Sequence, residues 1–119
     1  MSEVLLTVCE FKVFMRDAAR LLTADACDEL VRFLATHPGA GELIPGTGGV
    51  RKYRQPASGR GKRGGARVIY YYLDRDTPLY LIAIYAKNEK HDLSGAEIER
   101  LKAMTTTVKQ QRAKRKKAI

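Results

Sequence analysis

A pair of strand-like runs late in the chain constrains the fold more than any other feature. Residues 66–74 and 79–86 are rich in Val, Ile and Tyr, and only the four residues 75–78 separate them. Runs of this composition favour β-strands, and so short a connection joins antiparallel neighbours. A similar run, 50–55, precedes them. The second half of the chain is therefore predicted to form a small, antiparallel-rich sheet.

Helical patterns precede this sheet. A short strand-like stretch, Val4 to Glu10, is followed by apolar residues at helical spacing over 11–22 and again over 24–37. Thr23 is placed to cap the second of these helices, and Pro38 and Gly39 end it. Residues 39–49, which include Pro45, Gly46, Gly48 and Gly49, are predicted to be a surface loop.

The C-terminal segment starts with a helix signal and ends in a run of cations. Ser94 and Glu97 have the spacing of a capping box ahead of an amphipathic helix. Residues 109–119 contain six Lys and Arg, and they form either the last turns of this helix or a frayed basic extension. The predicted order is βααβββα, an α+β fold in one domain over residues 1–119, with the helices on one face of the sheet and the other face left available.

The chain carries no signal for export or membrane insertion. No leader pattern occurs at the N-terminus, and no apolar run approaches the roughly 20 residues of a spanning helix. A cytoplasmic protein without a membrane partner is expected. Cys9 and Cys27 fall in a predicted strand and a predicted helix without zinc-site spacing, and are predicted to be reduced core thiols.

The charge distribution indicates a polyanionic partner. Residues 1–50 hold 4 Lys and Arg against 7 Asp and Glu, a net charge of −3, whereas residues 51–119 hold 18 against 6, a net charge of +12. A basic half of this size is typical of proteins that bind nucleic acid, although it can also be an idle solvated surface.

The densest cluster of cations lies on the two predicted strands 50–55 and 66–74 and on the loop that joins them. Strand alternation places Lys52 and Arg54 on one face and Arg51 on the other, and it turns Arg67 away from the face of Val68 and Tyr70. Lys52 and Arg54 are the preferred phosphate-binding pair, and a structural ion pair is the alternative for Arg67. The cluster comprises Arg51, Lys52, Arg54, Arg60, Lys62, Arg63 and Arg67.

The segment 59–64 matches the G-x-G-x-x-G pattern of dinucleotide-binding proteins. In that motif the loop follows a strand and opens a helix. Here the segment joins two predicted strands, so we reject a dinucleotide site. A basic loop that contacts RNA is the preferred interpretation, and a merely flexible loop is the alternative.

A second polar cluster, 87–92, ends the last strand. RNA cleavage by internal transfer needs a base, cations for the phosphate and an acid for the leaving oxygen, which Lys87 and Lys90 can help to supply. His91 is either catalytic or an exposed loop residue, and His37 is interpreted as a helix C-terminal residue. Because the acidic residues are scattered without ligand spacing, no metal or cofactor is predicted.

Three segments together resemble the HigB-type branch of the RelE toxins. They are Leu43 to Gly49, Gly59 to Tyr71, and Tyr85 to Lys90. The resemblance implies a RelE-like fold and a toxin of a type II toxin–antitoxin pair. It further implies an mRNA endoribonuclease that enters the ribosomal A site, contacts rRNA and leaves a 5′-hydroxyl product. A cognate helix-turn-helix antitoxin is the implied protein partner.

The resemblance also implies roles for individual residues. Lys52 and Arg54 match a pair of strand lysines used in proton removal and phosphate binding, with Lys52 the better base because a guanidinium is a poor one. Arg67 matches an arginine that stabilises the transition state. Lys87, or in its place Lys90, falls where the family has its general acid. The remaining cations, including Lys114 and Arg115, are expected to bind RNA.

Two rival functions stay open at this point. A binding inhibitor like the gyrase-directed ParE branch would share the fold but cleave no RNA. A basic RNA- or ribosome-binding module without catalytic activity would share the charge distribution.

Overall fold

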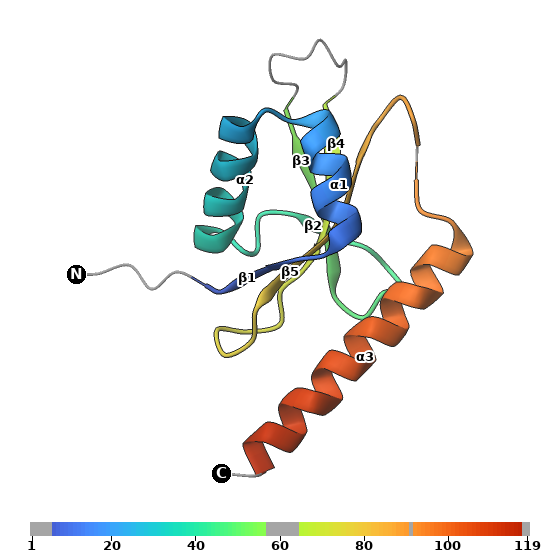
Figure 1. The fold of residues 1–119 in the computed structure, drawn as a ribbon. Helices are drawn as coiled ribbons and strands as arrows, with labels where there is room; N and C mark the ends of the chain where they lie inside the picture. Colours follow the sequence, from blue (N-terminus) through green and yellow to red (C-terminus); the bar gives the residue numbers. More distant parts are fainter. Residues whose placement is uncertain (1–5, 57–64, 91, 118–119) are drawn as a thin grey trace, which may run out of the picture.

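The fold is an α+β arrangement with a central five-stranded mixed sheet. A computed structural model describes residues 6–56, 65–90 and 92–117. The sheet order is β1-β5-β4-β3-β2, and only the β1–β5 pair is parallel (Figure 1). The elements are β1 (Val8–Glu10), α1 (Lys12–Leu21), α2 (Ala24–Thr36), β2 (Glu42–Leu43), β3 (Val50–Gln55), β4 (Ala66–Tyr71), β5 (Leu79–Ala86) and α3 (Gly95–Lys117).

The local signals for the helices and for the central hairpin are confirmed. β5 has the predicted bounds, and α1 and α2 each lie within one residue of theirs. Thr23 caps α2, because its Oγ1 accepts a hydrogen bond of 3.1 Å from the Ala26 N–H. Ser94 and Glu97 form the predicted capping box, with bonds of 2.8 and 3.2 Å between each side chain and the other residue's N–H.

Apolar side chains pack on both faces of the sheet. On one face, α1 and α2 cover Val68, Tyr70 and Leu81. On the other, α3 contributes Leu101 and Val108 to a second cluster with strand side chains such as Val50, Ile69 and Tyr71. The prediction that one face of the sheet stays open was therefore wrong, because apolar side chains of α3 pack against it.

Several predicted boundaries differ from the structure. Leu6 and Thr7 lie before β1, which begins only at Val8, and β4 ends at Tyr71 rather than Asp74. The basic end of the chain continues α3 as far as Lys117. Cys9 is exposed and Cys27 half-buried, so Cys9 is not a core residue, and both thiols are free. None of the helices in the described ranges is long and apolar enough to cross a membrane.

The segment predicted as a loop contains β2 and is tied to the sheet and to α3. The Tyr70 hydroxyl accepts a bond from the Gly41 N–H and donates one to the Pro38 carbonyl, each 2.8 Å long. Thr47 is fully buried, and its carbonyl accepts a 2.8 Å bond from the Thr105 hydroxyl of α3. These bonds fix the segment that leads into β3.

Candidate active site

Three cations gather on one face of the sheet at the end of β3 and the start of β4. Arg54 is the cross-strand partner of Arg67, and Arg67 is in turn the partner of Tyr85 on β5. Cross-strand partners share a face, and so do residues two apart on a strand. Lys52 therefore lies on this face as well, opposite Ile69. The predictions that Lys52 and Arg54 share one face of the strand, and that Arg67 points away from the face of Val68 and Tyr70, are both confirmed.

A pocket of about 400 Å³ opens beside these cations. Sequence reasoning did not identify Glu42 or Tyr53 as pocket residues. Glu42 joins the site because β2 pairs it with Lys52, and a two-residue strand gives no periodic signal. A basic pocket that also holds one carboxylate can bind an anion and accept a proton. Its lining residues are Ala40, Glu42, Lys52, Tyr53, Arg54 and Arg67.

Tyr85 extends this row of side chains onto β5. The ring is buried, and its hydroxyl has no hydrogen-bond partner among the described residues. Burial raises the pKa of the Tyr85 hydroxyl, and the nearby Asp92 adds to this increase, while Arg67 opposes it. The hydroxyl is therefore a neutral group close to the charges of the site. Lys90 Nζ lies 5.7 Å from the centre of the Tyr85 ring.

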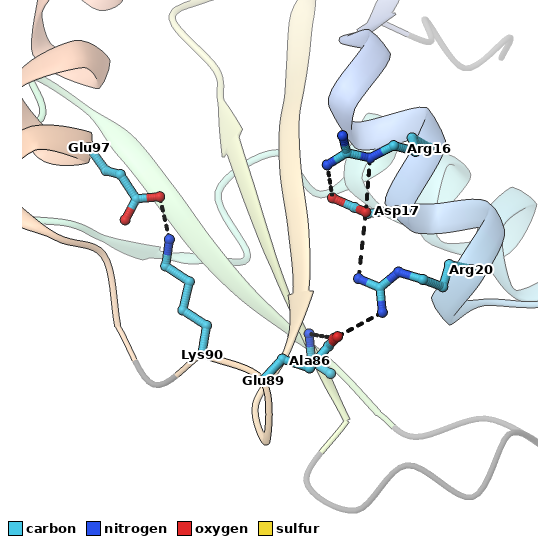
Figure 2. Close-up of polar contacts among 7 residues, drawn as sticks. All are labelled: Arg16, Asp17, Arg20, Ala86, Glu89, Lys90 and Glu97. Atoms are coloured by element: carbon cyan, nitrogen blue, oxygen red, sulfur yellow. Dashed lines mark hydrogen bonds and ion pairs between the residues drawn. The ribbon is translucent and has the colours of Figure 1, made fainter.

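The turn that follows β5 is tied to a helix on each side of the sheet (Figure 2). Glu89 accepts a 2.8 Å ion-pair bond from Arg20 of α1. Lys90 forms an ion pair with Glu97 of α3. Lys87 is exposed, and its N–H donates a 3.3 Å bond to the Gly65 carbonyl, which continues the ladder beyond β5. The turn thus presents Lys87 and Lys90 one strand away from Arg67.

Glu97 serves both the start of α3 and the cation of the turn. One carboxylate oxygen accepts the Ser94 N–H of the capping box, and the other accepts a proton of Lys90 Nζ. The hydrogen bond from Lys90 lowers the pKa of the Glu97 carboxyl, and the Ser94 N–H lowers it further. Glu97 is therefore held as an anion, and its ion pair keeps the Lys90 side chain in place.

The other predicted RNA-binding cations lie apart from this pocket or outside the described residues. Arg51 is on the opposite face of β3 and donates bonds of 3.3 and 2.7 Å to the carbonyls of Gly39 and Gly41. Lys114 and Arg115 are exposed on the last turns of α3, just beyond Arg112, which pairs with Asp74 and Asp76 of the β4–β5 turn. Arg60, Lys62, Arg63 and His91 fall outside the described residues.

The remaining candidates are accounted for by local structure. His37 stands at the C-cap of α2, as predicted, and its ring stacks on Phe33. Within the described ranges, no three His, Cys, Asp or Glu side chains lie close enough together to hold a metal ion.

A protein-family model matches about two thirds of the chain. The model described as the RelE toxin of the RelE/RelB toxin–antitoxin system matches residues 41–119. This range contains β2 to β5 and α3, and with them all five residues predicted to be catalytic.

Proposed function

Because the chain belongs to the RelE family of toxins from toxin–antitoxin systems, we propose that it is a ribosome-dependent endoribonuclease that cleaves mRNA in the A site. Toxins of this family generally inhibit translation. The observation that carries the proposal is the convergence of Lys52, Arg54 and Arg67 on one open pocket. Three cations on neighbouring strands fit the charge of a phosphodiester.

In this proposal the pocket and the turn after β5 together supply groups for each step of internal transfer. Cleavage requires that the 2′-oxygen lose a proton, attack the phosphorus and displace the 5′-oxygen, which must gain a proton. In this proposal Arg54 and Arg67 bind the non-bridging oxygens and stabilise their growing charge, since guanidinium groups are suited to phosphate geometry. The products are a 2′,3′-cyclic phosphate and a 5′-hydroxyl end.

Two residues of the pocket are suited to accept the 2′-hydroxyl proton. Lys52 is the residue implied by family resemblance, but an ammonium group must lose a proton before it can accept one. Glu42, its cross-strand partner on β2, brings a carboxylate that can accept a proton directly. We propose Glu42 as the base and Lys52 as the cation that binds the phosphate beside it.

The departing 5′-oxygen needs a proton donor on the other side of the phosphate. The turn after β5 carries Lys87 and Lys90. In the sheet, β4 with Arg67 lies between β3 and β5, so this turn is on the side of Arg67 away from β3. Lys90 is held in place by its ion pair with Glu97, while Lys87 is exposed and makes no side-chain bond with the described residues. Lys87 is therefore the proposed acid, and Lys90 a further phosphate ligand.

The proposal includes the setting in which the toxin works. A cytoplasmic location gives access to ribosomes, and the cations at the end of α3 would contact rRNA. A cognate antitoxin is implied by the family, and we propose that it is a small helix-turn-helix protein encoded beside this chain.

Mapping of new mRNA 5′-ends after induction in cells tests the proposal. Arg67→Ala is the active-site variant, and Arg75→Ala, an exposed arginine on the β4–β5 turn, is its matched control. In-frame cleavages with 5′-hydroxyl ends are expected with wild type and Arg75→Ala but not with Arg67→Ala. Growth arrest with intact mRNA would favour a ParE-like binding inhibitor, and absence of arrest would favour a non-catalytic RNA-binding module.

A further inference from the structure

Tyr53 is the aromatic residue in the wall of the cationic pocket. Among the described residues that line the pocket, no other side chain is aromatic. Tyr53 lies on β3 between Lys52 and Arg54 and is half-buried. Tyr53 therefore belongs both to the edge of the α1/α2 core and to the lining of the pocket in which an anion would bind.

The ring of Tyr53 is supported from the side of α2. The centres of the Tyr53 and Phe33 rings are 5.3 Å apart, with 31° between their planes. Phe33 also stacks on His37, with ring centres 4.6 Å apart and planes inclined by 15°. His37 Nδ1 lies 2.9 Å from the Thr36 hydroxyl oxygen and 3.3 Å from the Phe33 carbonyl oxygen, which orients the imidazole. The three rings form a preorganised aromatic stack that ends at the pocket.

Tyr53 lines the pocket although Lys52 and Arg54 point to the opposite face of β3, and the short pairing of β3 with β2 accounts for this. β2 pairs only with Arg51 and Lys52, so the edge of β3 beyond Lys52 has no β2 partner. The pocket is lined by Lys52 and Arg54, which share one face of β3, by Tyr53 between them, and by Ala40. A nucleotide lying over the edge would place its phosphate on the cationic side and its base on the side of Tyr53.

We infer that Tyr53 stacks on a nucleobase of the bound RNA, next to the phosphate held by Lys52, Arg54 and Arg67. The inference rests on the proposed function, since it assigns the base-binding residue of the same site. Every base has a π-face, so an aromatic ring binds single-stranded RNA with little regard to sequence. Phe33 and His37 act as positioning residues, because they keep the ring in place before RNA binds.

An alternative role for Tyr53 is that of a packing residue alone, since its ring also contacts the α1/α2 core. The two roles differ in what the protein discriminates. A stacking residue strengthens binding of a nucleotide with a base and leaves binding of a bare sugar–phosphate chain unchanged. A packing residue affects both ligands equally, through the stability of the pocket.

Titration of the full chain with two short ligands separates these roles. The ligands are a 2′-O-methyl RNA trinucleotide, which cannot be cleaved, and an abasic trinucleotide with the same backbone. Binding is followed by NMR chemical shifts. The trinucleotide should bind wild type on the order of 10-fold more tightly than the abasic ligand, the usual contribution of one stacked base. NOEs between base protons and the Tyr53 ring are expected in the complex.

Three variants complete the experiment. Tyr53→Leu should lose most of the preference for the trinucleotide and keep its affinity for the abasic ligand, whereas Tyr53→Phe should behave as wild type. Tyr72→Leu is the matched control, because Tyr72 is a half-buried tyrosine that packs against the same core and does not line the pocket.

Each contrary outcome has a distinct meaning. Equal affinity of wild type for the two ligands, or NOEs to other residues only, would overturn the inference even if Tyr53→Leu failed to fold. An equal loss for both ligands in Tyr53→Leu would assign the residue to packing. A wild type that binds neither ligand would overturn the pocket as an RNA site and, with it, the proposed function.

Discussion

Arg54 and Arg67 stand directly opposite each other on the antiparallel strands β3 and β4. Like charges in this position repel each other and destabilise a sheet. Lys52, on the same face, adds a third cation to the same pocket. Like charges that destabilise a fold are expected at a binding site, because the ligand requires them there. A bound polyanion neutralises these charges and so relieves the repulsion.

Replacement of Arg54 should separate stability from RNA binding. Arg54→Gln removes one of the facing charges, and we expect the free energy of unfolding to rise by about 0.2–1 kcal/mol. RNA affinity should fall, because one phosphate ligand is lost. Urea unfolding at low and high salt measures the first effect, which salt should weaken. Lys102→Gln, an exposed cation of α3, controls for the change in net charge. Equal stabilisation by both variants would contradict a specific Arg54–Arg67 repulsion.

Two adjacent tyrosines should respond oppositely to loss of the hydroxyl. Tyr70 and Tyr71 are both almost fully buried, but only the Tyr70 hydroxyl is hydrogen-bonded, to Gly41 and Pro38. Tyr70→Phe leaves a buried N–H without a partner and should cost about 1–3 kcal/mol of unfolding free energy. In Tyr71→Phe a buried hydroxyl without a partner among the described residues is removed, so a neutral or slightly stabilising effect is expected. Thermal and urea unfolding compare the two, and a similar cost for both would refute this account.

Local patterns in the sequence predicted the elements that depend on nearest neighbours. The β5 strand, the Thr23 cap and the Ser94–Glu97 capping box could all be identified, because turn residues, side-chain spacing and alternation are visible in a short window. For the same reason, alternation placed Lys52 and Arg54 on one face of a strand.

Features that depend on contacts between distant segments were not predicted. β2 is a two-residue strand that pairs with β3, and Tyr70, 29 residues after Gly41, holds Gly41 beside it by a hydrogen bond. A sequence pattern shows neither contact, so it could not place Glu42 in the pocket. Likewise, periodicity showed that α3 has an apolar stripe but not which face of the sheet would bury it. Tyr53 could not be linked to Phe33, since the sequence contains no signal for their stacking.

Two glycines in the segment that leads into β3 should differ sharply in how well they tolerate replacement by alanine. Gly48 has a φ of +78°, and a Cβ there would lie 2.5 Å from the Thr105 Oγ1 of α3. Gly48→Ala should therefore destabilise the protein by about 1–3 kcal/mol through backbone strain and steric overlap. At Gly39 a Cβ would meet no atom within 4 Å, so Gly39→Ala should be neutral. Thermal unfolding of the pair measures the difference, and equal melting temperatures would show that the segment adjusts.

The cations at the end of α3 should contribute to ribosome binding but not to binding of a short RNA. Arg112 pairs with Asp74 and Asp76, which anchors this part of α3 near the β4–β5 turn, at the far end of β4 from Arg67. We expect that a trinucleotide in the pocket does not reach these cations, whereas rRNA can. The double variant Lys114→Ala/Arg115→Ala should weaken ribosome binding. It should also lower the slope of log affinity against log salt concentration by the amount expected for the loss of about two phosphate contacts.

Co-sedimentation with ribosomes at several salt concentrations provides the measurement, and trinucleotide titration provides the control. If the double variant lost trinucleotide affinity to the same degree, the two ends of the molecule would have to act on one RNA site.

The ion pair between Lys90 and Glu97 should make stability depend on pH in the acidic range. The pKa of Glu97 in the folded protein is lowered by Lys90 and by the Ser94 N–H. A carboxyl with a lowered folded pKa stabilises the fold above its unfolded pKa, about 4.3 for glutamate, and loses this contribution as the pH falls through the folded value. Glu97→Gln should keep the capping box, because glutamine also fits that position, and remove only the charge.

Wild type should accordingly have a higher free energy of unfolding than Glu97→Gln at pH 7. This difference should vanish once the pH falls below the lowered pKa of Glu97 in the folded protein. Urea unfolding of both proteins across this range gives the comparison, with Glu99→Gln, an exposed carboxylate of α3, as the matched control. Since about 30% of each side chain of the pair is exposed, the gain at pH 7 should be modest, and salt should reduce it. A difference that persisted unchanged in acid would show that glutamine disturbs the cap, and that the charge of Glu97 contributes nothing to the fold.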